Sequence, residues 1–147
     1  MTALPEVDAL AARIHQTAVD HGFWDKPRNL GEMLMLVCSE LAECLEEDRE
    51  HNPLIYFQCT ECGYRALNLR EELAAWGHYK PDTQGKPCLN NHALKPEGAL
   101  VEVADAIIRL FDTGHDMASR TRYTLSEVML IKMDYNDTRS HMHGKRY

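Results

Sequence analysis

The chain has no long hydrophobic run and no recognisable leader segment. Its longest apolar runs, such as residues 33–38, fall far short of the roughly 20 residues that a membrane-spanning helix needs. The first residues include Glu6 and Asp8 and lack a basic segment followed by an apolar one, so we recognise no signal peptide. We therefore expect a cytoplasmic protein that does not bind membranes.

Basic residues are also scarce, with 16 Lys and Arg against 23 Asp and Glu and a net charge of −7. Binding to a nucleic-acid polymer depends on neutralising phosphates, so this balance argues against such a partner. The two signs are nevertheless separated along the chain. Residues 31–50 hold seven acids and one base, whereas residues 120–147 hold six bases and three acids. An acidic helix suits a metal ion, and a basic tail suits a phosphate.

Two motif classes are missing as well: a glycine-rich phosphate-binding loop, and a serine or cysteine nucleophile motif. Their absence is consistent with direct attack by water if the chain is a hydrolase. We also find no internal repeat. The 147 residues, 44% of them hydrophobic, can supply one core, and we expect a single helical domain over residues 1–147.

Hydrophobic residues recur with the period of a helix in four stretches. We expect helices over residues 5–21, 30–50, about 100–113 and 124–139. Gly114 is expected to end the third helix, and Thr124 with Glu127 has the spacing of a capping box for the fourth. Cys38 and Cys44 lie in the second helix, where we expect small core residues. Together these stretches predict an all-α bundle of about four main helices.

Residues 54–96 interrupt the helical pattern and form a loop-rich insert. A short strand at residues 55–57 leads into Cys59 and Cys62, which are spaced as half of a zinc knuckle. Cys88 and His92 could supply the other half, with His78 as a replacement ligand. One structural Zn²⁺ could staple this segment, which is too polar to order itself. The alternatives are a redox-active Cys-x-x-Cys pair and thiols that bind nothing.

Four carboxylates repeat one helical spacing in two places: Glu40 with Glu43, and Glu102 with Asp105. A spacing of three residues puts both members of a pair on one helix face. Two such pairs facing each other would repel unless a cation lay between them, and hard oxygen ligands of this density suit Mg²⁺. The alternative is a solvated acidic helix surface, because each pattern also occurs by chance.

The order of four sequence blocks resembles the MazG-like nucleotide pyrophosphohydrolases, which belong to the all-α NTP pyrophosphatase superfamily. The similarity covers residues 5–50 and 96–147, about two-thirds of the chain, and leaves out the insert. Many relatives have an acid directly before the first glutamate, where this chain has Ser39. The blocks are Trp24-Asp-Lys-Pro-Arg-Asn-Leu30, Ser39-Glu-Leu-Ala-Glu43, Glu102-Val-Ala-Asp105 and Lys132-Met-Asp-Tyr-Asn-Asp-Thr-Arg139.

This resemblance implies Mg²⁺-dependent hydrolysis of (deoxy)nucleoside triphosphates to monophosphate and pyrophosphate. The implied Mg²⁺ ligands are Glu40, Glu43, Glu102 and Asp105. For catalysis, Glu40 or Glu43 would deprotonate the attacking water, and Lys132 with Arg139 would offset charge on the departing pyrophosphate.

Substrate binding is expected from a loop before the acidic helix and from the last helix. Lys132, Asn136 and Arg139 fall on one helical stripe that fits a polyphosphate, although a solvated polar face has the same spacing. Trp24 could stack on a base or cap the core. The full expected set is Trp24, Arg28, Asn29, Lys132, Asn136, Arg139 and Lys145.

Relatives assemble as dimers or tetramers, so the resemblance implies a homodimer or homotetramer here. A bundle of so few helices also favours self-association. The competing function is a non-catalytic, zinc-containing helical adaptor that binds another protein.

Overall fold

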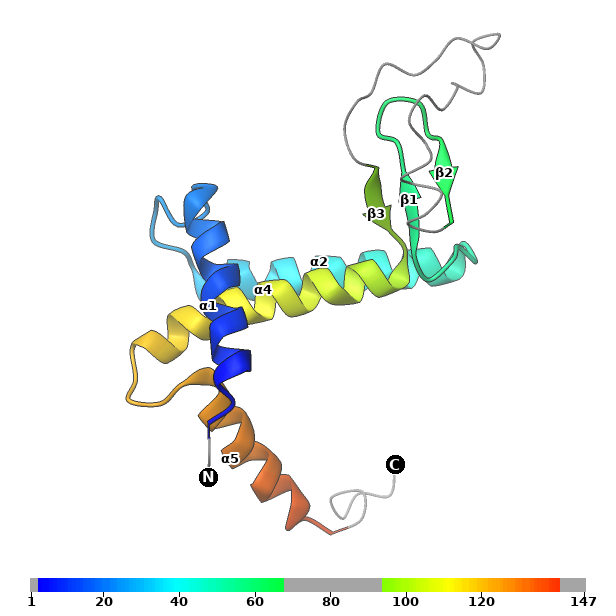
Figure 1. Ribbon diagram of the computed structural model, residues 1–147. Helices are drawn as coiled ribbons and strands as arrows, with labels where there is room; N and C mark the ends of the chain where they lie inside the picture. The colour runs from blue at the N-terminus through cyan, green and yellow to red at the C-terminus, as the bar shows by residue number, and fades with distance from the viewer. Residues whose placement is uncertain (1–2, 68–93, 141–147) are drawn as a thin grey trace, which may run out of the picture. The chain divides into compact units, whose positions relative to one another are not determined.

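The computed structural model describes residues 3–67 and 94–140, and these are mostly helical (Figure 1). The chain divides into two compact units, residues 1–34 with 108–147 and residues 35–107. The helices are α1 (Pro5–Asp20), α2 (Leu30–Arg49), α4 (Ala99–Ser119) and α5 (Leu125–Asp137). The strands are β1 (Tyr56–Gln58), β2 (Arg65–Ala66) and β3 (Lys95–Glu97).

In the first unit, residues 1–34 and 108–147, α1 contacts α5. The hydroxyl of the fully buried Ser126 donates to Asp8 Oδ2 at 2.6 Å and accepts from the Leu4 backbone N–H at 3.0 Å. The predicted capping box is confirmed: Thr124 Oγ1 accepts from the Glu127 N–H at 3.2 Å, and Glu127 Oε2 accepts from the Thr124 N–H at 2.8 Å. These bonds fix the start of α5 against α1.

Gly114 does not end a helix as predicted, because α4 continues to Ser119. A Cβ at Gly114 would lie 3.1 Å from each of the two methyl carbons of Leu125. The glycine therefore permits the close approach of Leu125, which is the first residue of α5. A glycine in a helical pattern can mark either an end or a close contact, and the sequence does not distinguish the two.

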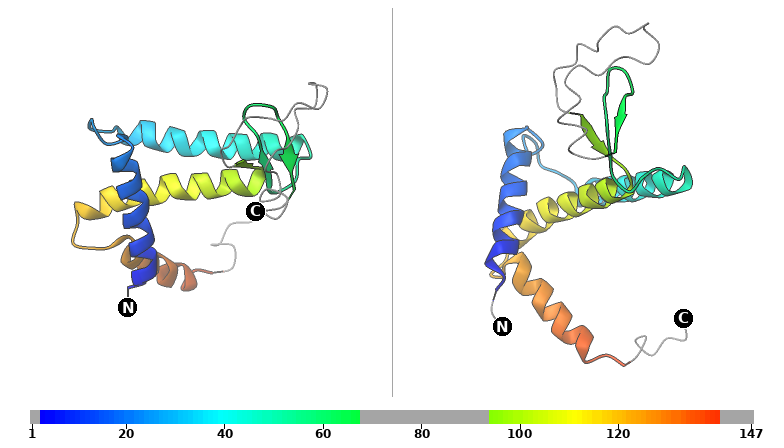
Figure 2. Two further views of the ribbon diagram at one scale, coloured as in Figure 1. Left: turned by 45° about the horizontal axis from the view of Figure 1, so that its top comes forward. Right: turned by 45° about the vertical axis from the view of Figure 1, so that its right-hand side comes forward.

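In the second unit, residues 35–107, the segments of α2 and α4 run side by side, and the three strands lie in the described parts of the insert and at its end (Figures 1 and 2). The antiparallel sheet has the order β2-β1-β3, with Phe57 opposite both Ala66 and Pro96. The predicted strand at residues 55–57 is confirmed within one residue, whereas β2 and β3 were not predicted. The fold is thus mostly helical rather than all-α.

The two ends of the insert meet at Gly98. Its φ is +112°, and a Cβ there would lie 2.6 Å from the Pro53 carbonyl oxygen and 2.7 Å from that of Leu54. Only glycine accommodates both this backbone conformation and this close approach. The Leu100 N–H donates to the Leu54 carbonyl at 2.9 Å, which joins the first turn of α4 to the end of the α2–β1 connection.

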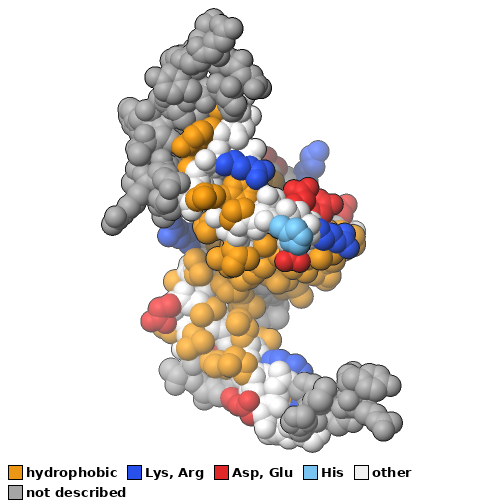
Figure 3. Space-filling model, turned by 90° about the vertical axis from the view of Figure 1, so that its right-hand side faces the viewer, with side chains coloured by type: hydrophobic (Ala, Val, Ile, Leu, Met, Phe, Trp, Pro, Cys, Tyr) orange, Lys and Arg blue, Asp and Glu red, His pale blue; other side chains and the backbone are white. Residues whose placement is uncertain are grey.

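Much of the apolar surface of the helices is exposed in the single chain (Figure 3). On α2, Leu34, Leu41 and Leu45 are 45%, 52% and 47% exposed. The prediction of core cysteines is wrong for Cys38, which is exposed, while Cys44 is half-buried. In the described ranges, no helix is both long and apolar enough to span a membrane.

Candidate functional site

Three carboxylates of the second unit converge: Glu40 from α2, and Glu102 and Asp105 from α4. One oxygen from each side chain lies within 4.8 Å of the other two. Glu40 and Glu102 are each only 6% exposed. The three-residue spacing on α4 places its two acids on one face, and α2 supplies the third from alongside. Three of the four predicted Mg²⁺ ligands are therefore brought together, and we call these three residues the carboxylate cluster.

Glu102 shows the electrostatic consequence of this convergence. Burial raises its pKa, and the charges of Glu43, Asp105 and Glu40 raise it further, to about 6. Ionising Glu102 is therefore unfavourable in the folded protein. A divalent cation between these oxygens would reverse that effect, because it attracts the charges that otherwise repel one another.

Glu43, the fourth predicted ligand, is exposed and does not belong to the carboxylate cluster. Its charge nevertheless contributes to the raised pKa of Glu102. Glu43 is therefore close enough for electrostatic coupling to the carboxylate cluster while its carboxylate stays open to water.

Lys95 of β3 is a residue at this site that the sequence analysis missed. Its Nζ pairs with Glu97 Oε1 at 2.7 Å. This hydrogen bond raises the pKa of the Lys95 ammonium against the opposing effect of burial, and the charges of Glu102 and Glu43 add to the rise. The Lys-x-Glu alternation of a strand could have indicated the pair. Nothing local indicates that the pair lies near the carboxylates.

Glu47 is a further half-buried carboxylate of α2. Its Oε1 accepts a hydrogen bond from the Tyr56 hydroxyl at 3.3 Å, and its buried Oε2 has no partner in the described part of the chain. Burial and the Glu47 charge both raise the pKa of Tyr56. This contact links α2 to β1 and so connects the insert to the helix that carries Glu40 and Glu43.

Trp24 is held in the first unit by the buried side chain of Asp112. The indole N–H donates to Asp112 Oδ1 at 3.0 Å, and His15 Nδ1 lies 2.7 Å from the same oxygen. The Arg28 guanidinium carbon lies 5.8 Å from the centre of the indole ring. Trp24 therefore links the loop to α1 and α4, and its contact with a nucleobase stays a prediction.

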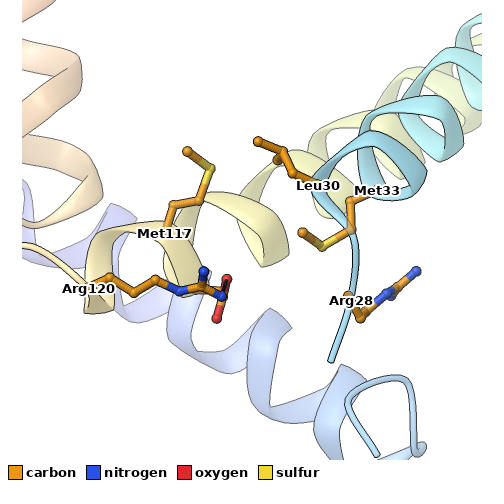
Figure 4. A pocket seen from close by; sticks show the side chains of 6 residues that line it. Arg28, Leu30, Met33, Met117 and Arg120 are labelled. Atoms are coloured by element: carbon orange, nitrogen blue, oxygen red, sulfur yellow. Dashed lines mark hydrogen bonds and ion pairs between the residues drawn. The ribbon is translucent and has the colours of Figure 1, made fainter. Parts of the chain in front are cut away.

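Asn29 has a local structural role. Its side-chain oxygen accepts from the Gly31 N–H at 2.7 Å and so caps the start of α2. Arg28, next to it, lines a pocket of about 250 Å³ in the first unit (Figure 4). Arg120 of the same pocket is paired with Asp116 at 2.6 Å. The lining is formed by Arg28, Leu30, Met33, Asp116, Met117 and Arg120.

Lys132 and Asn136 are exposed on α5, and Arg139 is exposed just beyond it, because the helix ends at Asp137 and not at residue 139 as predicted. The Lys132 ammonium and the Arg139 guanidinium lie 4.8 Å and 5.9 Å from the centre of the Tyr135 ring, so both cations approach one aromatic side chain. The remaining predicted residues lie outside the described residues; they are Lys145, Cys88, His92 and the replacement ligand His78. Comparison with protein-family models, curated proteins and solved structures finds no match for this chain.

Proposed function

We propose that the chain is a Mg²⁺-dependent nucleotide pyrophosphohydrolase, which converts (deoxy)nucleoside triphosphates into monophosphate and pyrophosphate. The observation that carries the proposal is the carboxylate cluster, in which oxygens from two helices of one unit lie within 4.8 Å of one another. The resemblance of the four sequence blocks to MazG-like enzymes supports the reaction class.

The donor set fits the proposed ion. Mg²⁺ prefers hard oxygen ligands and keeps coordination positions for water and substrate phosphate, which three carboxylates leave available. When bound, the ion supplies Lewis acidity towards a phosphate oxygen and lowers the pKa of water. Glu40, Glu102 and Asp105 would hold and orient it.

Glu43 is the residue best suited to act as the general base. It is exposed, lies outside the carboxylate cluster and is electrostatically coupled to Glu102. Its carboxylate would accept a proton while the water oxygen forms a bond to the α-phosphorus. The bond from that phosphorus to the bridging oxygen then breaks, and pyrophosphate leaves.

The resemblance to MazG-like enzymes, and no contact in the described structure, supports Lys132 and Arg139 as the phosphate-binding groups of the proposal. The Lys132 side chain is exposed on α5 and the Arg139 side chain is exposed just beyond its end, so both charged ends are accessible to a ligand. A guanidinium can bind two phosphate oxygens at once, and a cation offsets the charge that develops on the leaving pyrophosphate.

The test measures pyrophosphate release by the purified full chain from a panel of NTPs and dNTPs, with and without Mg²⁺. Asp105→Asn and Glu40→Gln should each lower the rate by on the order of 100-fold, because each removes a ligand of the ion. Asp48→Asn removes a charge from an exposed position of α2 and should leave the rate unchanged. Absence of release from every nucleotide, or an equal loss in Asp48→Asn, would overturn the proposal.

We also propose that the chain forms a homodimer or homotetramer through the exposed apolar faces of the second unit. Leu41 and Leu45 are 52% and 47% exposed on α2, while Leu100 and Ile107 are 55% and 46% exposed on the adjacent α4. Two side-by-side helices leave one layer of apolar residues uncovered. A second copy of the same layer can cover it with twofold symmetry.

Light scattering coupled to size-exclusion chromatography tests this assembly. The wild-type chain should have at least twice the mass of a monomer, and Leu45→Glu should lower that mass. Leu54→Glu is the matched control, because Leu54 is 69% exposed but lies outside both helices. A wild-type monomer contradicts the assembly without affecting the proposed hydrolysis.

A further inference from the structure

The Cys-x-x-Cys turn of the insert has no part in the proposed hydrolysis. We propose that Cys59 and Cys62 are two thiolate ligands of a structural Zn²⁺ ion, bound at the turn between β1 and β2. The proposal rests on the geometry of this turn, on the small size of the sheet that it closes, and on the position of both cysteines at the core of that sheet.

The backbone of the turn brings the two cysteines together. The Cys59 carbonyl accepts from the Gly63 N–H at 2.9 Å, and the Cys59 N–H donates to the Tyr64 carbonyl at 2.9 Å. The first of these bonds closes an α-turn, in which the first and fourth residues are neighbours as on one turn of a helix. Cys59 and Cys62 are these two residues, and a chelating Cys-x-x-Cys needs this arrangement.

Gly63 explains how the chain can make this turn. Its φ is +72°, a conformation that glycine adopts without strain. Among the described residues, no atom beyond its two chain neighbours lies within 4 Å of the position that a Cβ would take at Gly63, so the glycine serves the backbone conformation. The Cys-x-x-Cys-Gly sequence therefore specifies a defined turn.

Among the described residues, the sheet has only a small apolar core. Its strands have three, two and three residues. Small sheets with a core of this size usually need a cross-link or a metal ion, because they bury little apolar surface. Cys59 is 1% exposed within the core, and Cys62 packs against it. A metal ion held by both would therefore lie at the core of the sheet. Four described residues are buried in this core: Phe57, Cys59, Ala66 and Leu94.

A metal ion explains the pair better than a disulfide does. No disulfide links Cys59 to Cys62 in the described part of the chain. Such a bond would close a very short loop, and the stabilisation from a disulfide grows with the length of the loop. A tetrahedral ion instead is held by both thiolates at once and keeps two further coordination positions.

The ion would also stabilise the strand that carries Lys95. Gln58, which directly precedes Cys59, is paired with Lys95 in the sheet, and Leu94 belongs to the same core as Cys59. The position of β3 therefore depends on the turn. Because β3 places Lys95 within electrostatic reach of Glu102, loss of zinc should also disturb the surroundings of the carboxylate cluster.

The experiment measures zinc by mass spectrometry in the full chain after dialysis against metal-free buffer. We expect about one zinc ion per chain, released by a mercurial reagent that modifies thiolates. Cys59→Ser and Cys62→Ser should each lower the zinc content to near zero. Cys38→Ser and Cys44→Ser are matched controls on α2 and should keep it.

If the Cys59 and Cys62 variants fail to fold, Co²⁺ exchanged into the wild-type chain decides the question. The thiolate-to-cobalt absorption should have the intensity of at least two thiolates. A zinc content far below one per chain without this absorption overturns the proposal, as does an equal loss of zinc in Cys38→Ser. Nucleotide hydrolysis is measured separately, so an inactive chain that holds zinc contradicts only the proposed function.

Discussion

Two buried carboxylates of α4, Glu102 and Asp112, have opposite surroundings. Asp112 accepts from the Trp24 indole at 3.0 Å and faces His15 Nδ1 at 2.7 Å. Glu102 instead has a pKa of about 6, because it is buried and surrounded by other acids. Both side chains are carboxylic acids and both lie on α4, so their different roles follow from their neighbours. Asp112 holds the first unit together, whereas Glu102 needs a cation to be ionised at low cost.

The largest effect of this difference is expected in Mg²⁺ binding. Glu102→Gln should weaken Mg²⁺ binding by at least roughly 100-fold, because it removes a central charge of the carboxylate cluster. Asp112→Asn should keep the affinity of the wild-type chain. Titration calorimetry measures both affinities. Equal losses in the two variants would show that the two carboxylates do not differ in role.

In the absence of metal, the order of the two variants should reverse: Asp112→Asn should be the one that loses stability. Asp112→Asn should lower the free energy of unfolding by about 2–3 kcal/mol, because it weakens charged hydrogen bonds at a buried position. Glu102→Gln should leave this free energy unchanged or raise it, because it removes repulsion from four neighbouring acids, Glu43, Asp105, Glu40 and Glu97. Denaturant unfolding in EDTA measures both. A strongly destabilised Glu102→Gln would mean that the Glu102 charge is already compensated.

The pH dependence of stability in EDTA is a smaller effect with a defined sign. The pKa of Glu102 rises from its ordinary 4.5 to about 6 on folding, so the folded chain binds this proton more tightly. The stabilisation from this proton is complete below pH 4.5 and is lost as the pH rises towards 6. Asp8 acts in the opposite sense at lower pH. Its burial raises its pKa, but hydrogen bonds from Ser126 lower it below 3.8 overall.

Melting temperatures between pH 4.5 and 7 test this dependence, with Glu102→Gln as the reference chain. The difference in melting temperature between the wild-type chain and the variant should become more negative as the pH rises to about 6, then level off. Saturating Mg²⁺ should remove this trend. A constant difference across the range would contradict the raised pKa of Glu102.

Local physics made the helices and their starts predictable from the sequence. The periodic apolar residues of α1 and α2 and the Thr124–Glu127 capping box depend only on neighbours within one or two turns. Asn29 lies directly before α2, where asparagine is a favoured N-cap residue. This role was predictable from the sequence, although Asn29 was predicted to bind substrate instead.

Contacts between distant segments were only partly predictable. Repeated carboxylate spacing identified the three residues of the carboxylate cluster, but it did not separate Glu43 from them. Lys95 could not be placed beside Glu102, because β3 has only three residues and no periodic pattern. The prediction that Gly114 ends a helix was wrong, because the glycine makes room for the side chain of Leu125, which is distant in the sequence.

The smallest effect is expected at Asp116, a third acid of α4. Its carboxylate pairs with Arg120 at 2.6 Å, but the Arg120 side chain is 68% exposed. Asp116→Asn should therefore change the free energy of unfolding by no more than about 0.5 kcal/mol, because water replaces the lost partner. The same denaturant measurement as for Asp112→Asn gives the value. If Asp116→Asn were as destabilising as Asp112→Asn, a cationic partner would contribute more to the free energy of unfolding than the burial of the bonded pair does. A small loss of unfolding free energy in Asp116→Asn would instead show that a cationic partner alone contributes little. The structural role of Asp112 would then follow from the burial of its bonds with Trp24 and His15.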